Sequence, residues 1–347
     1  MDITDLLIAM TTNKASDLHL SSNYPPMLRI NGDVVPFTDT PLTPDQVKLF
    51  IYSVMNEAQQ SMYEKDLEMD FAIQFHDKAR FRVNVYTNIK GCAAAFRLIP
   101  NKIQTFDELD IPDSIRRFAN LKKGLVLVTG KTGSGKTTTL ASIIDHINST
   151  MEKHILTIED PVEFIHKPKK ALVSQRELHS STQSFSRALK SALREDPDVI
   201  LVGELRDLET IQLALSAAET GHLVFGTLHT NSAAKTVERI IDVFPGNEKE
   251  LVRAMLSSSI QGVISQALVK GAKGGRVAVQ EVMVGTNAVR NLIREGKTAQ
   301  IQSMIQVGKK DGMIVLKDRA LEMFEAGIIT QEVYKELTYT AESQSNS

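Results

Sequence analysis

The chain has 347 residues, of which 42% are hydrophobic and 24% charged, and its formal net charge is −2. That balance argues against a strongly basic nucleic-acid-binding chain, and Cys92, the only cysteine, excludes an internal disulfide or a cysteine zinc cluster. No apolar run reaches the roughly 18 residues of a membrane-spanning helix, and the acidic start lacks the basic region of a signal peptide, so we expect a cytoplasmic protein.

Residues 1–100 have the pattern of a small α+β domain with an antiparallel sheet. Short runs with period-2 stretches predict strands at Ser16–Ser21, Met27–Ile30, Asp33–Phe37, Met69–Phe75, Ala79–Asn88 and Ala93–Ile99. Asn31-Gly32 is a hairpin signal between the second and third of these strands. We expect a helix to begin at Thr43-Pro44-Asp45, with proline at its first position, and to run to about Asn56.

Residues 101–120 are expected to connect two domains, with a short helix from Asp113 to Ala119. Over residues 121–347 strand-like and helix-like stretches alternate, which predicts a mainly parallel α/β sheet. The expected strands are Leu125–Thr129, His154–Glu159, Ala171–Ser174, Val199–Gly203, Leu223–Thr227 and Val277–Val284. The expected helices lie near residues 137–149, 184–195, 207–219 and 232–242. From about residue 249 the pattern is mostly helical, apart from the last strand.

Residues Gly130–Thr137 match the phosphate-binding pattern G-x-x-x-x-G-K-[ST] and lie between an apolar run and a helix-like pattern. Glycines let successive N–H groups point at a phosphate, and a helix N-terminus adds partial positive charge. We predict that Lys136 reaches the β- and γ-phosphates of ATP and that the Thr137 hydroxyl holds Mg²⁺. The predicted nucleotide-binding residues are Gly130, Lys131, Thr132, Gly133, Ser134, Gly135, Lys136, Thr137 and Thr138. A flexible glycine turn without a ligand is the alternative, which the flanking strand and helix disfavour.

The apolar run Val199–Gly203 ends in an acid, Glu204. A buried strand that ends in a carboxylate is the physical form of a Walker B element, so Glu204 is predicted to support the metal. The alternative is a core strand that ends in a solvated glutamate.

A second acidic strand end follows His154–Glu159. Pro161 should end this strand and turn the chain, which would orient Glu163, our candidate general base for the attacking water. Glu159 or Asp160 could help to hold the metal through water. An acidic turn on the surface is the alternative interpretation of this segment.

Polar residues also follow the strand expected at Leu223–Thr227. His229 is a candidate to sense the γ-phosphate or to bridge to the water, and His222, before the strand, is a second one. A structural histidine is the alternative for each. The acid- and histidine-bearing strand ends would meet at the carboxyl edge of a parallel sheet, where open α/β sheets bind ligands.

Arg80 and Arg82 alternate with Phe81 and Val83 on an expected strand, so the two arginines share one face. Planar guanidinium groups suit phosphate, and a positive charge from another subunit often accelerates ATP hydrolysis. The alternative is a pair of exposed arginines that bridge local acids. Similar candidates flank the nucleotide elements at Arg194, Arg206 and Arg239.

Together these motifs resemble those of the secretion-superfamily ATPases and, within them, the PilT family of type IV pilus retraction motors. The resemblance covers essentially the whole chain and is carried by Ser16–Leu20, Gly130–Thr137, Glu159–Glu163, Leu193–Glu204, Gly226–Thr230 and Ala288–Glu295. The last segment resembles a helix motif of retraction motors, with Val289 where the family usually has isoleucine. The single cysteine disfavours those assembly and type II secretion ATPases that carry a four-cysteine zinc element. The stretch Gly312–Asp318 departs from the main retraction motor, which leaves the accessory PilU group as an alternative.

The resemblance implies a PAS-like N-terminal domain joined to a RecA-like P-loop ATPase domain, six copies of the chain in a ring, and ATP with Mg²⁺ between the two domains. It implies that Glu163 is the catalytic glutamate and Glu204 the Walker B acid, with Arg80 and Arg82 approaching from a neighbouring domain. It assigns a histidine box to His222 and His229. The implied partners are an inner-membrane pilus platform protein and a paralogous retraction ATPase, with the ring peripheral at the inner membrane and no nucleic acid bound.

We therefore predict a hexameric motor that hydrolyses ATP to drive type IV pilus retraction, with motion transmitted through the 101–120 connector. An accessory retraction paralogue or a pilus assembly or type II secretion ATPase is the alternative within this class. A DNA translocase and a non-enzymatic nucleotide-dependent scaffold are the alternatives from other classes. The sequence pI of about 6.5 argues against the translocase, and the intact set of acids argues against the scaffold.

Overall fold

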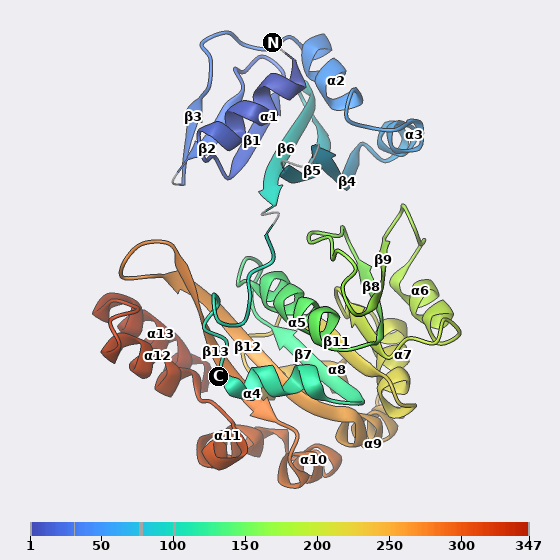
Figure 1. Cartoon of the computed structure of the whole chain (residues 1–347), viewed down its shortest axis with the longest axis vertical. Helices are drawn as coiled ribbons and strands as arrows, with labels where there is room; N and C mark the ends of the chain where they lie inside the picture. The colour runs from blue at the N-terminus through green and yellow to red at the C-terminus, as the bar shows by residue number, and fades with distance from the viewer. Residues whose placement is uncertain (1, 31, 76–78, 100–101, 346–347) are drawn as a thin grey trace. The chain divides into compact units, whose positions relative to one another are not determined.

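The computed structural model describes residues 2–30, 32–75, 79–99 and 102–345 (Figure 1). The chain divides into two compact units, Met1–Lys102 with Asp160–Ile165 and Ile103–Glu159 with His166–Ser347. The expected boundaries place Asp160–Ile165 in the second domain, whereas these residues belong to the first unit. Each unit has its own sheet and its own hydrophobic core.

The first unit contains an antiparallel sheet in the order β3-β2-β1-β6-β5-β4. Its elements are α1 (Ile3–Thr12), β1 (Asp17–Ser21), β2 (Met27–Ile30), β3 (Asp33–Pro36), α2 (Pro44–Tyr52), α3 (Glu57–Asp66), β4 (Glu68–Phe75), β5 (Ala79–Asn88) and β6 (Gly91–Ile99). The predicted turn between β2 and β3 includes Asn31, which lies outside the described residues, while Ile30 pairs with Asp33 on either side of it. In β5 the side chains of Phe81 and Val83 are fully buried, as the period-2 alternation predicts.

Two helices of the first unit were not expected from the sequence. α1 begins with a capping box between Asp2 and Asp5 and buries an apolar face. α3 also begins with a capping box, between Asn56 and Gln59, but only Tyr63 is buried among its ten residues. Because α3 lacks an apolar stripe, the 3.6-residue period that predicts a helix is absent from its sequence.

The second unit contains a sheet in the order β13-β12-β7-β11-β10-β8-β9, in which β13 alone runs antiparallel to its neighbour. Its elements up to β11 are α4 (Asp113–Arg116), η1 (Arg117–Asn120), β7 (Gly124–Thr129), α5 (Lys136–Thr150), β8 (His154–Glu159), β9 (Leu172–Glu177), α6 (Phe185–Ala192), β10 (Val199–Val202), α7 (Leu208–Glu219) and β11 (Leu223–Leu228). The remaining elements are α8 (Ala233–Asp242), α9 (Lys249–Ser259), β12 (Ile260–Lys270), β13 (Arg276–Val284), α10 (Asn287–Arg294), η2 (Thr298–Gln300), α11 (Ile301–Val307), η3 (Gly308–Asp311), α12 (Leu316–Glu325) and α13 (Gln331–Ser345).

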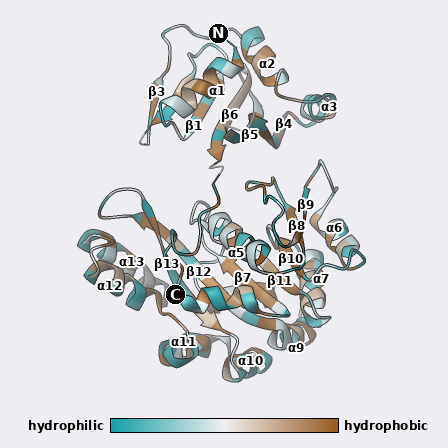
Figure 2. Ribbon diagram, in the orientation of Figure 1, coloured by the Kyte–Doolittle hydropathy of each residue, from teal (hydrophilic) through white to brown (hydrophobic). Residues whose placement is uncertain are grey.

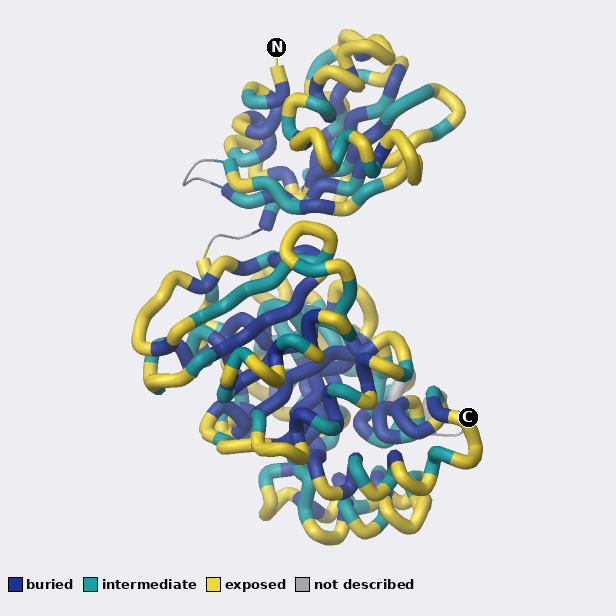
Figure 3. The backbone as a smooth tube through the Cα atoms, turned by 90° about the vertical axis from the view of Figure 1, so that its right-hand side faces the viewer, coloured by how far each residue is buried: buried dark blue, intermediate teal, exposed yellow. Residues whose placement is uncertain are grey.

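Helices cover both faces of this second sheet. α4 and α5 pack on one face, and α6 to α11 contribute to the core on the other (Figure 1). The central strands β7 and β11 are hydrophobic (Figure 2), and every residue of both is buried. Figure 3 shows buried backbone through the middle of this unit. Among the described residues, no helix combines the length and the apolar character needed to cross a bilayer.

The expectation of a mostly helical region after residue 249 is wrong for β12 (Ile260–Lys270). This strand lies between β7 and β13 and has buried residues on both faces of the sheet. A strand that is buried on both sides loses the polar–apolar alternation, so its apolar run cannot be told from a buried helix by periodicity. β12 therefore adds a strand next to the strand that leads into the glycine motif.

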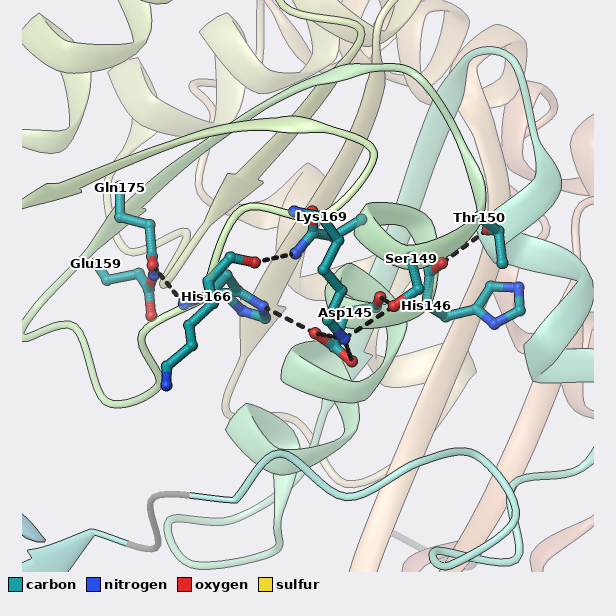
Figure 4. Close-up of polar contacts among 10 residues, drawn as sticks. Asp145, His146, Ser149, Thr150, Glu159, His166, Lys169 and Gln175 are labelled. Carbon is teal, nitrogen blue, oxygen red and sulfur yellow. Dashed lines mark hydrogen bonds and ion pairs between the residues drawn. The ribbon is translucent and has the colours of Figure 1, made fainter. Parts of the chain in front are cut away.

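A polar cluster with one buried member, His166, lies between α5 and the segment that follows Ile165 (Figure 4). His166 is 6% exposed, and its Nδ1 lies 4.0 Å from Asp145 Oδ1. Lys169 Nζ lies 2.8 Å from the other carboxylate oxygen of Asp145. Burial lowers the pKa of His166 from 6.5 to about 4, although the charge of Asp145 acts in the opposite direction. His166 is therefore a neutral, buried residue of the folded chain at neutral pH.

Replacing His166 by glutamine should remove one source of acid sensitivity. The unfolded chain binds a proton at His166 near pH 6.5 and the folded chain only near pH 4, so this group lowers stability as the pH falls between those values. The slope from one group is at most about 1.4 kcal/mol per pH unit. Chemical denaturation across this window measures the free energy of unfolding, which should fall less steeply for His166→Gln than for the wild type. Parallel curves for the two proteins would contradict the burial of a neutral histidine.

Candidate functional site

The glycine motif connects β7 directly to α5. Gly135 is the N-cap residue of α5 and has a φ of 86°, a left-handed conformation that favours glycine. At Gly130, whose φ is 145°, an added Cβ would lie 2.3 Å from the backbone oxygen of Gln266. The first N–H groups of α5 have no partner within the helix and therefore face the loop. The predicted strand, loop and helix are all present, in a conformation suited to an anion.

Lys136 lies against the loop that precedes it. Its Nζ donates hydrogen bonds to the backbone oxygens of Gly130, at 2.8 Å, and of Lys131, at 3.2 Å. Burial lowers the pKa of Lys136, and the charge of Glu204 acts in the opposite direction. The ammonium group is therefore held against the backbone of the glycine loop.

Glu204 and His229 meet at the carboxyl edge of the sheet. Val202 in β10 pairs with Ile158 in β8 and with Gly226 in β11, so the residues that follow these strands emerge side by side. His229 Nε2 lies 3.1 Å from Glu204 Oε1.

Arg206 contacts the same carboxylate, with its Nε 2.7 Å from Glu204 Oε1. Burial alone would raise the pKa of Glu204, but the hydrogen bonds and charges of Arg206 and His229 together bring it below its ordinary value. The structure thus gathers Lys136, Glu204 and His229 in the second unit, with Glu204 in its charged form.

Within the second unit, His222, Arg194 and Arg239 lie apart from this edge. His222 precedes β11 at the amino-terminal edge of the sheet, where its backbone oxygen accepts from Gly124 N–H and its Nδ1 lies 3.0 Å from the oxygen of Ala217. Arg194 and Arg239 are exposed, at the end of α6 and on α8. In the part of the chain that the structure describes, Arg206 is the one of the three arginines flanking the nucleotide elements that contacts an acid of the site.

Gln175 joins the two ends of the segment that carries Glu163. Its Nε2 donates to Glu159 Oε1 at 3.3 Å, and its Oε1 accepts from the backbone N–H of His166 at 2.8 Å (Figure 4). Glu159 also accepts a hydrogen bond from Thr157 Oγ1 at 2.7 Å. The side chain of Gln175 therefore holds both residues that flank Asp160–Ile165, namely Glu159 at the end of β8 and His166.

Within the first unit, both arginines of β5 contact the segment that carries Glu163. Arg80 Nε donates to the backbone oxygen of Val162 at 3.0 Å. Arg82 Nη1 lies 3.9 Å from Glu163 Oε1, and its Nε lies 3.6 Å from Asp70 Oδ1. Arg82 thus bridges local acids, as the alternative interpretation of this pair expects. The structure brings the candidate general base together with both candidate arginines.

The late motif Ala288–Glu295 lies largely on α10 and divides into anchoring and exposed residues. Val289 and Ile293 are fully buried. Arg290 donates from Nε to the backbone oxygen of Gly285 at 2.8 Å and from Nη2 to Gln261 Oε1 at 3.1 Å. Arg294 is exposed. One arginine of the motif therefore holds the helix in place, while the other faces solvent.

The residues present suit a magnesium ion bound together with a nucleotide. Thr137 and Glu204 offer oxygen ligands, which Mg²⁺ prefers, and it usually binds one or two protein oxygens together with phosphates and waters. Across the described residues there is no group of three or more His, Cys, Asp or Glu side chains that could hold a metal. The oxygen donors of Thr137 and Glu204 suit a magnesium ion that also binds phosphates.

Gln175 and Gln266 were not predicted from the sequence. Neither belongs to a motif, and Gln266 lies in the strand that was expected to be helical. The one signal for Gln266 is that it lies, with Ser265, inside a largely apolar run, because a polar side chain needs a hydrogen-bond partner once such a run is buried.

Comparison with known proteins places the chain in a family. It is 55% identical to the type IV pilus retraction ATPase PilT of Pseudomonas aeruginosa, over 97% of this chain and 98% of that protein. It is 52% identical to a twitching motility protein of Neisseria gonorrhoeae, over 92% of this chain and 86% of that protein. A crystal structure of the pilus retraction motor PilT with bound ADP matches with a TM-score of 0.89 at 46% identity, covering 97% of each chain. A family described as type II/IV secretion system protein matches residues 1–337. The chain belongs to the type II/IV secretion system protein family.

Proposed function

We propose that this chain is the ATPase of type IV pilus retraction and that it hydrolyses ATP to ADP and phosphate. The observation that carries the proposal is the 55% identity to a retraction ATPase over nearly the full length of both chains. The geometry of the second unit supports the same chemistry, because a phosphate-binding loop, a cation and a charged carboxylate share one edge of a parallel sheet.

We infer that the second unit is a RecA-like ATPase domain and the first a PAS-like domain, over the expected ranges 121–347 and 1–100, with the connector 101–120 between them. The parallel strands β7, β11, β10 and β8, covered by helices on both faces, support the first assignment. An antiparallel sheet that carries helices supports the second.

The phosphate loop and its lysine would hold the nucleotide. Residues Gly130 to Thr138 would surround the phosphates, with Lys136 supplying positive charge. Thr137 and Glu204 would hold Mg²⁺, which when bound would neutralise charge that develops on the phosphates. His229 would sense the γ-phosphate through its contact with Glu204.

Glu163 would act as the general base that takes a proton from the attacking water. Its contact with Arg82 and the bond from Arg80 to Val162 set the orientation of this segment within the first unit. The two arginines would stabilise the charge that develops on the transferred phosphoryl group, approaching the site from a neighbouring domain of the ring.

The assembly proposed is a homohexamer on the cytoplasmic side of the inner membrane, in contact with a pilus platform protein and with a paralogous retraction ATPase. The exposed Arg294 on α10, next to the buried Val289 and Ile293, offers a charged surface for such a protein partner. Motion of one domain against the other through the connector would then drive retraction. The net charge of −2 gives no support to a nucleic-acid partner.

The first test concerns the general base. Glu163→Gln should leave ADP binding unchanged and lower the turnover number by roughly 10²–10⁴-fold, because the amide cannot accept the proton of water. Calorimetric binding of ADP and a phosphate-release assay measure the two quantities. The matched control is Glu152→Gln, at an exposed position beyond the far end of α5, which should keep both. Near-normal hydrolysis by Glu163→Gln would remove this assignment.

The second test concerns the direction of the motor. A strain that lacks the gene should carry abundant pili and show no twitching, because assembly would continue without retraction. Wild-type protein should restore twitching, and Lys136→Ala should not, because it loses the cation that contacts the phosphate loop. Loss of pili would indicate an assembly ATPase instead, and unchanged twitching would indicate an accessory paralogue.

A further inference from the structure

Gln266 is a buried side chain that lies against the phosphate-binding loop. It is 5% exposed and belongs to β12, the neighbour of β7 in the sheet. The residue before it, Ser265, pairs with Thr129, the last residue of β7. Gln266 therefore lies level with the point where the chain leaves the sheet and enters the loop.

Both the nitrogen and the oxygen of the Gln266 side-chain amide form hydrogen bonds. Its Nε2 donates to the backbone oxygen of Ser134 at 2.7 Å, and its Oε1 accepts from Thr139 Oγ1 at 2.8 Å. Both bonds are buried. One of them holds the loop just before Gly135, and the other holds the first turn of α5. A single side chain thus fixes the loop relative to the helix that follows it.

Close packing adds to these bonds. A Cβ on Gly130 would lie 2.3 Å from the backbone oxygen of Gln266, and a Cβ on Gly135 would lie 2.8 Å from its Nε2. The first and the last glycine of the loop are therefore both in contact with this one residue of β12. Neither the loop nor Gln266 can shift alone without losing a buried hydrogen bond or making a steric clash.

We propose that Gln266 is a positioning residue for nucleotide binding, which holds the phosphate loop in the conformation that receives the β- and γ-phosphates. The proposal rests on the nucleotide binding proposed above. Only an amide of this length offers a donor to the Ser134 oxygen and an acceptor to the Thr139 hydroxyl at once. A leucine offers neither, and a carboxylate cannot donate to the Ser134 oxygen.

β13 supplies a matched control residue. Gln280 is the register partner of Gln266 and is buried as well. Neither its Oε1 nor its Nε2 has a hydrogen-bond partner among the described residues. The two glutamines thus share residue type, hairpin and burial, and they differ in their bonds to the loop and to α5. Gln280→Leu reproduces the loss of a buried amide without touching those bonds.

The test measures ADP affinity by calorimetry and ATP turnover for Gln266→Leu, Gln280→Leu and the wild-type chain. Gln266→Leu should weaken ADP binding roughly 10-fold, because it leaves two buried groups at the loop unpaired. The KM for ATP should rise by a similar factor, while kcat at saturating ATP changes less. Gln280→Leu should keep the wild-type affinity.

Two outcomes would overturn the proposal. One is wild-type affinity in Gln266→Leu, and the other is an equal loss in both leucine variants, which would indicate a general packing effect. If Gln266→Leu does not fold, Thr139→Val removes the bond to Gln266 Oε1 without changing β12, and unchanged ADP affinity in that variant would also overturn the proposal. Failure of the wild-type chain to bind ADP would instead contradict the proposed function.

Discussion

The shared direction of β7, β11, β10 and β8 is the constraint on which the nucleotide site depends. Parallel strands end at the same edge of a sheet, so the residues that follow them come together although they lie far apart in sequence. The phosphate loop follows β7, Glu204 follows β10 and His229 follows β11. Helices on both faces bury these strands from solvent and pack against them. The gathering of these groups at one edge is therefore a consequence of sheet topology rather than of any single motif.

Opposite charges share this edge in a partly buried setting. Burial disfavours the charged form of Lys136 and, taken alone, that of Glu204. Arg206 and His229 reverse the effect for Glu204, and the Glu204 charge in turn supports the charged lysine. Arg206 and His229 thus favour the charged form of Glu204, and Glu204 favours that of Lys136, so loss of Glu204 would change the electrostatic environment of Lys136.

Sequence patterns predicted those parts of the fold whose signals are local. The glycine motif, the apolar strands before it and after it, and the alternation of β5 all follow from periods within a few residues. β12 was missed because burial on both faces erases alternation, and α3 because it has almost no buried face. The bonds of Gln175 and Gln266 depend on residues brought together only by the folded sheet, so no local pattern encodes them.

The segment Asp160–Ile165 also determines how the chain can be divided. The polypeptide passes from one unit to the other after Lys102, after Glu159 and after Ile165. A single break in the connector would therefore leave Arg80 and Arg82 on one fragment and the Val162 and Glu163 that they contact on the other. The amino-terminal fragment would therefore lack part of the first unit. The two units are compact, but neither is one continuous piece of chain.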